Sequence, residues 1–253
     1  MKKPRHLLAV HDLTQAEILN LFKKAKALKK RKARALAGRT LGLFFEKTST
    51  RTRVSFEVAM VQLGGHSIFL SKEEIQIRRG ETIADTARAL SRYLDGLVIR
   101  TYDHHTIEEW PRHATIPVIN GLTDLHHPCQ ALGDLFTVFE KKGRVSGLKL
   151  AYIGDGNNVA NSLIEGALRL GMNIALACPK GYEPNKDVLE FARQESKKTG
   201  ASIQVSHDPE AAAKGAGRSA KIAIRCSGTW SSAHATTATT AVSCSTSGGE
   251  PAE

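Results

Sequence analysis

The sequence predicts an α/β protein with two domains, each with a mainly parallel sheet flanked by helices. Short apolar runs typical of buried strands alternate with longer segments of helical periodicity, which implies strands joined by helical crossovers. Glycines follow several of the expected helices, as at Gly171 and Gly200. A glycine-bearing break at 143–147 separates two such series. We therefore expect the second series to form its own Rossmann-like domain, incomplete because the pattern stops at about Gly217.

The first domain is expected to span residues 1–142. Its first helix carries apolar residues at helical spacing from Leu13 to Leu28. Pro128 suits the first turn of its last helix. The expected helices are 14–36, 51–64, 82–93 and 128–141, and the expected strands are 41–45, 67–70, 96–99 and 117–119.

The second domain is expected at 143–217, followed by a low-complexity tail at 218–253. Its expected strands are 148–153, 173–177 and 202–205, and its expected helices are 158–170, 186–198 and 209–214. Ala, Ser, Thr and Gly dominate the tail, and such a segment cannot bury enough apolar surface to offset its ordering entropy. We expect the tail to be disordered apart from a strand at 221–224.

Bulk composition is that of a soluble globular protein, with 41% hydrophobic and 24% charged residues in 253. The net charge of +11 favours anionic partners, among them nucleic acid, anionic lipid and phosphorylated metabolites. No aromatic residues interleave with the lysines of the first helix, so a solvated basic face is favoured over nucleic-acid binding.

Membrane insertion and secretion are not expected. No apolar run approaches the roughly 18 residues of a membrane span. The residues Met1 to Val10 are charged and do not resemble a signal peptide. The four cysteines form no C-x-x-C pair, so we expect a reducing, cytoplasmic location.

The first candidate site is the turn from Ser49 to Arg53, between an expected strand and an expected helix. A helix start offers free N–H groups and a partial positive charge, to which Ser49, Thr50 and Thr52 add hydroxyls. Arg51 adds a planar fork that matches phosphate oxygens. The turn predicts a phosphate site; the alternative is that Ser49 or Thr50 only caps the helix.

The second candidate is Arg100, which ends the expected strand at 96–99. Ligands of open parallel sheets gather at the carboxyl ends of strands. A surface arginine without a ligand is the alternative.

The third candidate is the segment His126–Gln130, at the start of the helix that Pro128 begins. His127 can donate to an oxygen or shuttle a proton, and Gln130 can donate and accept. The alternatives are a capping or core histidine and, for His126 with His127, a metal pair. No carboxylate spacing supports a metal.

The fourth candidate is the turn Gly154–Asn158. It invites comparison with the dinucleotide fingerprint, but Val159 stands where the third glycine is needed. We therefore favour a tight turn that presents asparagine side chains to a ligand over a dinucleotide site.

Taken together, these motifs resemble one family. The segment Phe44–Glu57 looks like the carbamoyl-phosphate signature of transcarbamoylases, and His127–Asp134 is similar to their second signature, with Arg100 between the two. The resemblance covers about residues 5–216. It implies a two-domain fold, with carbamoyl phosphate bound by the first domain and the amino-acid acceptor by the second. Members of the family are commonly trimers with active sites at subunit interfaces.

The resemblance also implies roles for single residues. Ser49, Thr50, Arg51 and Thr52 would hold the phosphate; Arg100, His127 and Gln130 would contact the carbamoyl group. Gln76 resembles a residue that the family reaches across from a neighbouring subunit. Arg100, His127 and Thr52 are the expected catalytic residues.

Within the family, Phe45–Ser49, Cys129 and the turn Gly154–Asn158 resemble the ornithine branch, in which Asn158 would touch the acceptor. The implied reaction transfers the carbamoyl group to the δ-amine of L-ornithine, giving citrulline and phosphate. Arginine biosynthesis is the expected pathway, and arginine breakdown stays open as the alternative. The reaction needs no metal and no organic cofactor.

The sequence lacks the Asp-x-Trp-x-Ser-Met loop and the His-Cys-Leu-Pro segment of that branch. Two alternatives therefore stay open: an inactive fragment that binds carbamoyl phosphate, and a transcarbamoylase for another amine.

Overall fold

The computed structural model describes residues 4–30, 33–73, 75–214, 216, 220–223 and 242–243. Two compact units make up the chain: residues 1–13 with 19–129, and residues 14–18 with the chain from Gln130 onward. The domain boundary predicted at residues 142 and 143 stays a prediction.

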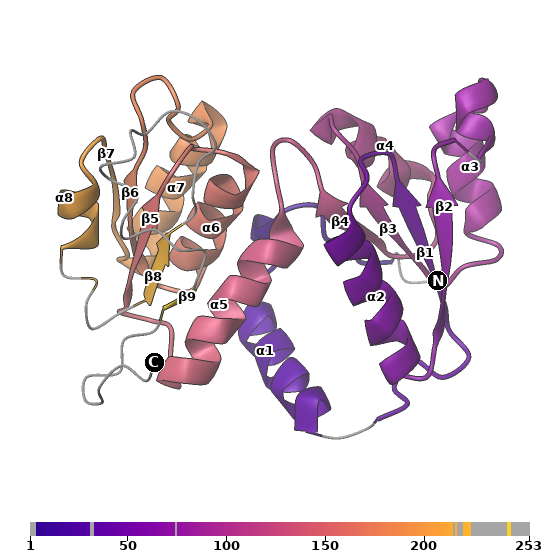
Figure 1. The fold of residues 1–253 in the computed structure, drawn as a ribbon, viewed down its shortest axis with the longest axis horizontal. Helices are drawn as coiled ribbons and strands as arrows, with labels where there is room; N and C mark the ends of the chain where they lie inside the picture. Colours follow the sequence, from indigo (N-terminus) through magenta and orange to yellow (C-terminus); the bar gives the residue numbers. More distant parts are fainter. Residues whose placement is uncertain are drawn as a thin grey trace. The chain divides into compact units, whose positions relative to one another are not determined.

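The first unit contains a four-stranded parallel sheet in the order β2-β1-β3-β4 (Figure 1). Its strands are β1 (Thr40–Phe45), β2 (His66–Ser71), β3 (Gly96–Arg100) and β4 (Val118–Leu122). The helices of this unit are η1 (Val10–Asp12), α2 (Thr50–Gln62), η2 (Gln76–Arg79), α3 (Ile83–Leu90) and α4 (His104–His113). From β1 the chain adds β2 on one side, and then β3 and β4 on the other side. Ligands of open α/β sheets bind at such a switch point, which here lies between β1 and β3.

The core of the first unit follows the alternation of its strands. Phe44 and Ile99 face one side of the sheet, where they pack with Trp110 of α4. Leu43 and Val98 face the other side, where Phe56 of α2 and Phe69 of the neighbouring strand β2 pack against them. Since successive side chains of a strand point to opposite faces, this alternation requires helices on both sides.

The second unit contains a five-stranded sheet in the order β7-β6-β5-β8-β9, parallel except for β9. Its strands are β5 (Lys149–Ile153), β6 (Asn173–Ala177), β7 (Ile203–Ser206), β8 (Ala220–Ala223) and β9 (Val242–Ser243). Its helices are α6 (Asn158–Arg169), α7 (Lys186–Thr199) and α8 (Pro209–Ala213).

Two helices have residues in both units: α1 (Gln15–Lys30), which follows Thr14, and α5 (Pro128–Lys142). No helix among the described residues is long and apolar enough to span a bilayer.

The predicted fold class is confirmed, and the expected strands and helices agree with the structure to within a few residues at most ends. The helix α4 was not predicted, because Pro111 and three histidines obscure its periodicity and only Ile107 and Trp110 are fully buried. The tail predicted to be disordered lies outside the described residues, apart from β8, close to the expected strand at 221–224, and β9.

Candidate functional site

The turn after β1 places several hydroxyl donors at the start of α2. Ser49 caps the helix, and its Oγ accepts the backbone N–H of Thr52 at 3.4 Å. The Ser49 hydroxyl also lies 3.0 Å from Thr52 Oγ1, so these two side chains are held together. Thr50 and Arg51 begin the helix with exposed side chains. The cap is therefore real, but it leaves Thr50 and Arg51 facing solvent at a positive helix end.

Arg100 reaches the same turn from the end of β3. Its Nη1 lies 3.5 Å from Thr52 Oγ1. The pairing with β4 shifts register between Ile99 and Arg100, and such irregularities re-aim side chains at the ends of strands. The backbone oxygen of Arg100 accepts the N–H of Glu46 at 2.8 Å, which joins the ends of β1 and β3.

The charges at this edge of the first sheet are unbalanced. Burial, and then the positive charge of Arg51, lower the pKa of the Arg100 guanidinium. Its Nε is buried and has no hydrogen-bond partner among the described residues. A buried donor on a charged group costs free energy when it makes no hydrogen bond. A bound anion would accept that hydrogen bond and would relieve the repulsion between Arg51 and Arg100.

His127 completes the group. Burial, and then the charge of Arg100, lower its pKa to about 4. The imidazole is therefore neutral near pH 7, so it carries one N–H that can donate to an oxygen.

A carboxylate at the same edge is already engaged. Glu46 accepts hydrogen bonds from Lys72 and Thr101, which lower its pKa although burial opposes them. The Glu46 carboxylate thus pairs with Lys72 and Thr101, and not with Arg51 or Arg100. Sequence reasoning missed this residue because a single glutamate within a motif gives no sign of its partners.

Gln76 is exposed at the first position of η2. Its predicted role toward a neighbouring subunit stays a prediction.

Gln130 and Asn158 belong to the second unit. Gln130 Nε2 donates to Asp134 Oδ1 at 2.9 Å. Burial raises the pKa of Asp134 to about 6, although the bond from Gln130 opposes it. Asn158 begins α6, where Asn157 caps the helix by accepting the N–H groups of Val159 and Ala160.

The turn between β5 and α6 is filled by the chain itself. A Cβ on Gly156 would overlap the backbone of Glu183 and Pro184, and the Gly156 N–H donates to the Tyr182 oxygen at 2.7 Å. In a dinucleotide site the pyrophosphate occupies that space. The observed packing therefore argues against the dinucleotide alternative.

No group of three His, Cys, Asp or Glu side chains able to hold a metal ion occurs in the described part of the chain.

Comparison with known proteins decides the family. Residues 5–140 match the domain described as "Aspartate/ornithine carbamoyltransferase, carbamoyl-P binding domain", and residues 146–218 match the Asp/Orn binding domain of the same family. The chain belongs to the aspartate/ornithine carbamoyltransferase family. The turn at Ser49–Thr52, Arg100 and His127 all lie within the first match.

Relatives with similar sequences are named ornithine carbamoyltransferase. An ornithine carbamoyltransferase of Bacillus thuringiensis is 54% identical over 209 residues, which cover 82% of this chain and 66% of that protein. The ornithine carbamoyltransferase of Pyrococcus abyssi is 50% identical over 219 residues, or 85% and 69% of the two chains. The chain thus spans about two thirds of the length of these curated relatives.

Solved structures agree with the sequence relatives. The ornithine carbamoyltransferase of Pyrococcus furiosus matches with a TM-score of 0.83 at 46% identity, covering 93% of this chain and 75% of the other. An aspartate transcarbamoylase of Trypanosoma cruzi, solved with carbamoyl aspartate and phosphate, matches with a TM-score of 0.74 at 31% identity. That match covers 81% of this chain and 70% of the other.

Proposed function

We propose that the protein is an ornithine carbamoyltransferase, which transfers the carbamoyl group of carbamoyl phosphate to the δ-amine of L-ornithine. The observation that carries this proposal is the edge of the first sheet, where Thr52, Arg100 and Arg51 come together and the positive charges of the two arginines are unbalanced. The names of the relatives support ornithine as the acceptor.

In this proposal the helix start and Arg51 bind the phosphate. The free N–H groups of α2, the hydroxyls of Ser49 and Thr50, and the Arg51 fork would donate to its oxygens. Since the phosphate is the leaving group, the same donors stabilise the charge that it gains as its bond to the carbonyl carbon breaks.

The carbonyl oxygen of carbamoyl phosphate gains negative charge when the amine attacks. Arg100, Thr52 and neutral His127 are the donors proposed to face that oxygen, and the loss of one such donor typically costs about 3 kcal/mol of transition-state stabilisation. An amine with a pKa of about 10.4 is mostly protonated at neutral pH, so the acceptor must lose a proton before it attacks.

We propose Gln130 and Asn158 as further contacts, to the carbamoyl group and to ornithine. The hydrogen bond from Gln130 to Asp134 supports the first role, since it uses one amide N–H and leaves the amide oxygen to accept from a carbamoyl NH₂ group.

A homo-oligomer is part of the proposal, and the resemblance to the family favours a trimer. Val54, Val58 and Val61 are 49%, 45% and 71% exposed along α2. A shallow cavity of about 510 Å³ lies on the same helix and includes Thr50 and Arg51 in its lining. A second copy on this face would cover this apolar surface.

We place the protein in arginine biosynthesis and in the cytoplasm. A relative from Pyrococcus furiosus, 50% identical over 217 residues, is named "Ornithine carbamoyltransferase, anabolic".

The direct test is citrulline formation by the purified protein given carbamoyl phosphate and L-ornithine. L-aspartate in place of ornithine is the matched control for the acceptor. We expect citrulline and no carbamoyl aspartate. Carbamoyl aspartate alone would refute the acceptor, and no product from either amine would refute the activity.

A further inference from the structure

Two hydrogen bonds between Thr123 and His126 close the turn that leads into His127. The Thr123 N–H donates to the His126 oxygen at 2.8 Å, and the His126 N–H donates to Thr123 Oγ1 at 3.1 Å. Pro128 begins α5 directly after His127 and restricts its backbone to extended conformations. The direction in which His127 leaves the turn therefore depends on the geometry of residues 123–126.

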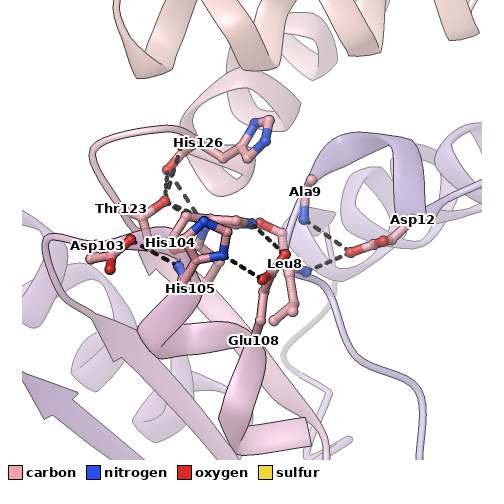
Figure 2. Close-up of polar contacts among 10 residues, drawn as sticks. Leu8, Ala9, Asp12, Asp103, His104, His105, Glu108, Thr123 and His126 are labelled. Atoms are coloured by element: carbon pink, nitrogen blue, oxygen red, sulfur yellow. Dashed lines mark hydrogen bonds and ion pairs between the residues drawn. The ribbon is translucent and has the colours of Figure 1, made fainter. Parts of the chain in front are cut away.

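The Thr123 hydroxyl is the centre of this turn, and it is fully buried. It lies 2.9 Å from His104 Nδ1 and 3.3 Å from the His126 oxygen (Figure 2). A hydroxyl has one proton and two lone pairs. The contacts with His104 and His126 are mutually compatible when His104 carries a proton on Nδ1: the hydroxyl then accepts from His104 and from the His126 N–H, and donates to the His126 oxygen.

Side chains of α4 and β4 hold these groups in place. His104 begins α4, and its ring meets the ring of His126 edge-on with centroids 4.8 Å apart. His104 Nε2 lies 4.0 Å from a carboxylate oxygen of Glu108 one turn later. From β4, the Asn120 amide lies 3.5 Å from both Thr123 Oγ1 and the His126 oxygen, and it donates to the Leu8 oxygen at 2.8 Å.

The first turn of α5 is tied to the same strand. Cys129 Sγ lies 3.4 Å from the backbone oxygen of Asn120, and burial raises the pKa of this thiol to about 12. The thiol therefore remains protonated and is suited to an anchoring contact. His127 is thus bracketed by two fixed points, the turn before it and the cysteine after it.

We infer that Thr123 is a positioning residue for His127, with His104 orienting the Thr123 hydroxyl. The inference rests on the proposed role of His127 toward the carbamoyl group. The donors proposed for the phosphate come from the turn after β1, which Thr123 does not form. Loss of the Thr123 hydroxyl should therefore impair recognition of the carbamoyl group and spare recognition of the phosphate.

The test compares two ligands by calorimetry on the full chain. The ligands are inorganic phosphate and phosphonoacetamide, the carbamoyl phosphate analogue with a methylene in place of the bridging oxygen. The variants are Thr123→Val, which removes the hydroxyl at nearly constant shape, and Thr123→Ser, which keeps it. His127→Ala is the benchmark. Thr199→Val is the control, because the Thr199 hydroxyl donates to the Glu195 oxygen at 3.0 Å on α7.

We expect Thr123→Val to lose about tenfold in phosphonoacetamide affinity, as His127→Ala does, with phosphate affinity kept within about twofold. Thr123→Ser should restore most of the loss, and Thr199→Val should change neither affinity.

Three outcomes would overturn the inference. Thr123→Val could leave phosphonoacetamide affinity intact while His127→Ala lowers it. Thr123→Val could instead weaken both ligands equally, which would indicate a general structural role. If Thr123→Val does not fold, His104→Leu takes its place. A ratio of phosphonoacetamide affinity to phosphate affinity equal to that of the wild type would then contradict the inference. His127→Ala binding phosphonoacetamide as tightly as wild type would refute the proposed role of His127 itself.

Discussion

The carboxyl ends of the two sheets carry similar strand–turn–helix segments but differ in what fills the turn. After β1, Arg51 and Arg100 repel each other and a buried guanidinium N–H lacks a partner among the described residues. After β5, the chain satisfies its own turn, because Gly156 packs on the backbone of Glu183 and Pro184.

This difference distinguishes a turn that is suited to bind an anion from a turn that only joins a strand to a helix. Both turns are polar, and both precede a capped helix, with Ser49 and Asn157 as the caps. A cap therefore does not distinguish them. Unbalanced charge and unpaired buried donors distinguish the two turns, because burying such groups without a ligand costs free energy.

The largest effect is expected where the second turn is broken. Gly156→Ala would force a methyl group into the backbone of Glu183 and Pro184. Overpacking of this kind costs about 3 kcal/mol of unfolding free energy. Gly133→Ala is the control, since a Cβ there meets no described atom within 4 Å on a helical residue, and it should stabilise the protein by about 1 kcal/mol. Urea unfolding followed by circular dichroism measures the unfolding free energy of both variants. A Gly156→Ala variant as stable as the wild type would show that the second turn has room for a methyl group.

A smaller effect concerns the first turn and its dependence on pH. The pKa of His127 is about 4 in the folded protein, against an ordinary value of 6.5. The unfolded chain binds a proton there below about pH 6.5 and the folded protein does not until about pH 4. The unfolding free energy should therefore fall by about 2 kcal/mol between pH 7 and pH 5 through this residue. His127→Gln should remove that part of the pH dependence, and a variant with the wild-type slope would contradict the burial of a neutral imidazole.

Asp134 should act with the opposite sign. Its pKa is about 6 when folded, against an ordinary value of 3.8, so the folded protein binds a proton more readily than the unfolded chain. Its contribution to the unfolding free energy should rise by about 1 kcal/mol as the pH falls from 7 to 5. Asp134→Asn should therefore make the protein lose more stability on acidification than wild type does. An acid dependence in that variant equal to that of the wild type would mean that Asp134 is well solvated.

The sequence was sufficient for most of the fold. Apolar runs such as Asn173–Ala177 gave strand bounds identical to those of β6, because buried parallel strands are nearly continuous in apolar residues. It was insufficient for α4, whose two buried side chains, Ile107 and Trp110, are too few to mark a period.

For the candidate site, the sequence identified the residues but not the contacts between them. The family motif named Thr52, Arg100 and His127, whereas their proximity depends on the strand order β2-β1-β3-β4. The proposed roles of Thr123 and His104 depend on a hydrogen bond between two side chains 19 residues apart in the sequence, which no local pattern records. The functional roles of all these site residues, and that of Gln76, remain predictions.

The central claim is that the turn after β1 binds the phosphate of carbamoyl phosphate, and two arginines of α2 provide a matched pair to test it. Arg51 is exposed at the helix start beside Arg100, whereas Arg53 bonds to Glu57 at 2.9 Å and covers the ring of Phe69. We expect Arg51→Ala to weaken phosphonoacetamide binding by more than about tenfold, Arg51→Lys to recover part of the loss, and Arg53→Ala to bind as wild type does. Isothermal titration calorimetry at one ionic strength measures all four proteins. Equal affinity in wild type and Arg51→Ala would contradict the account.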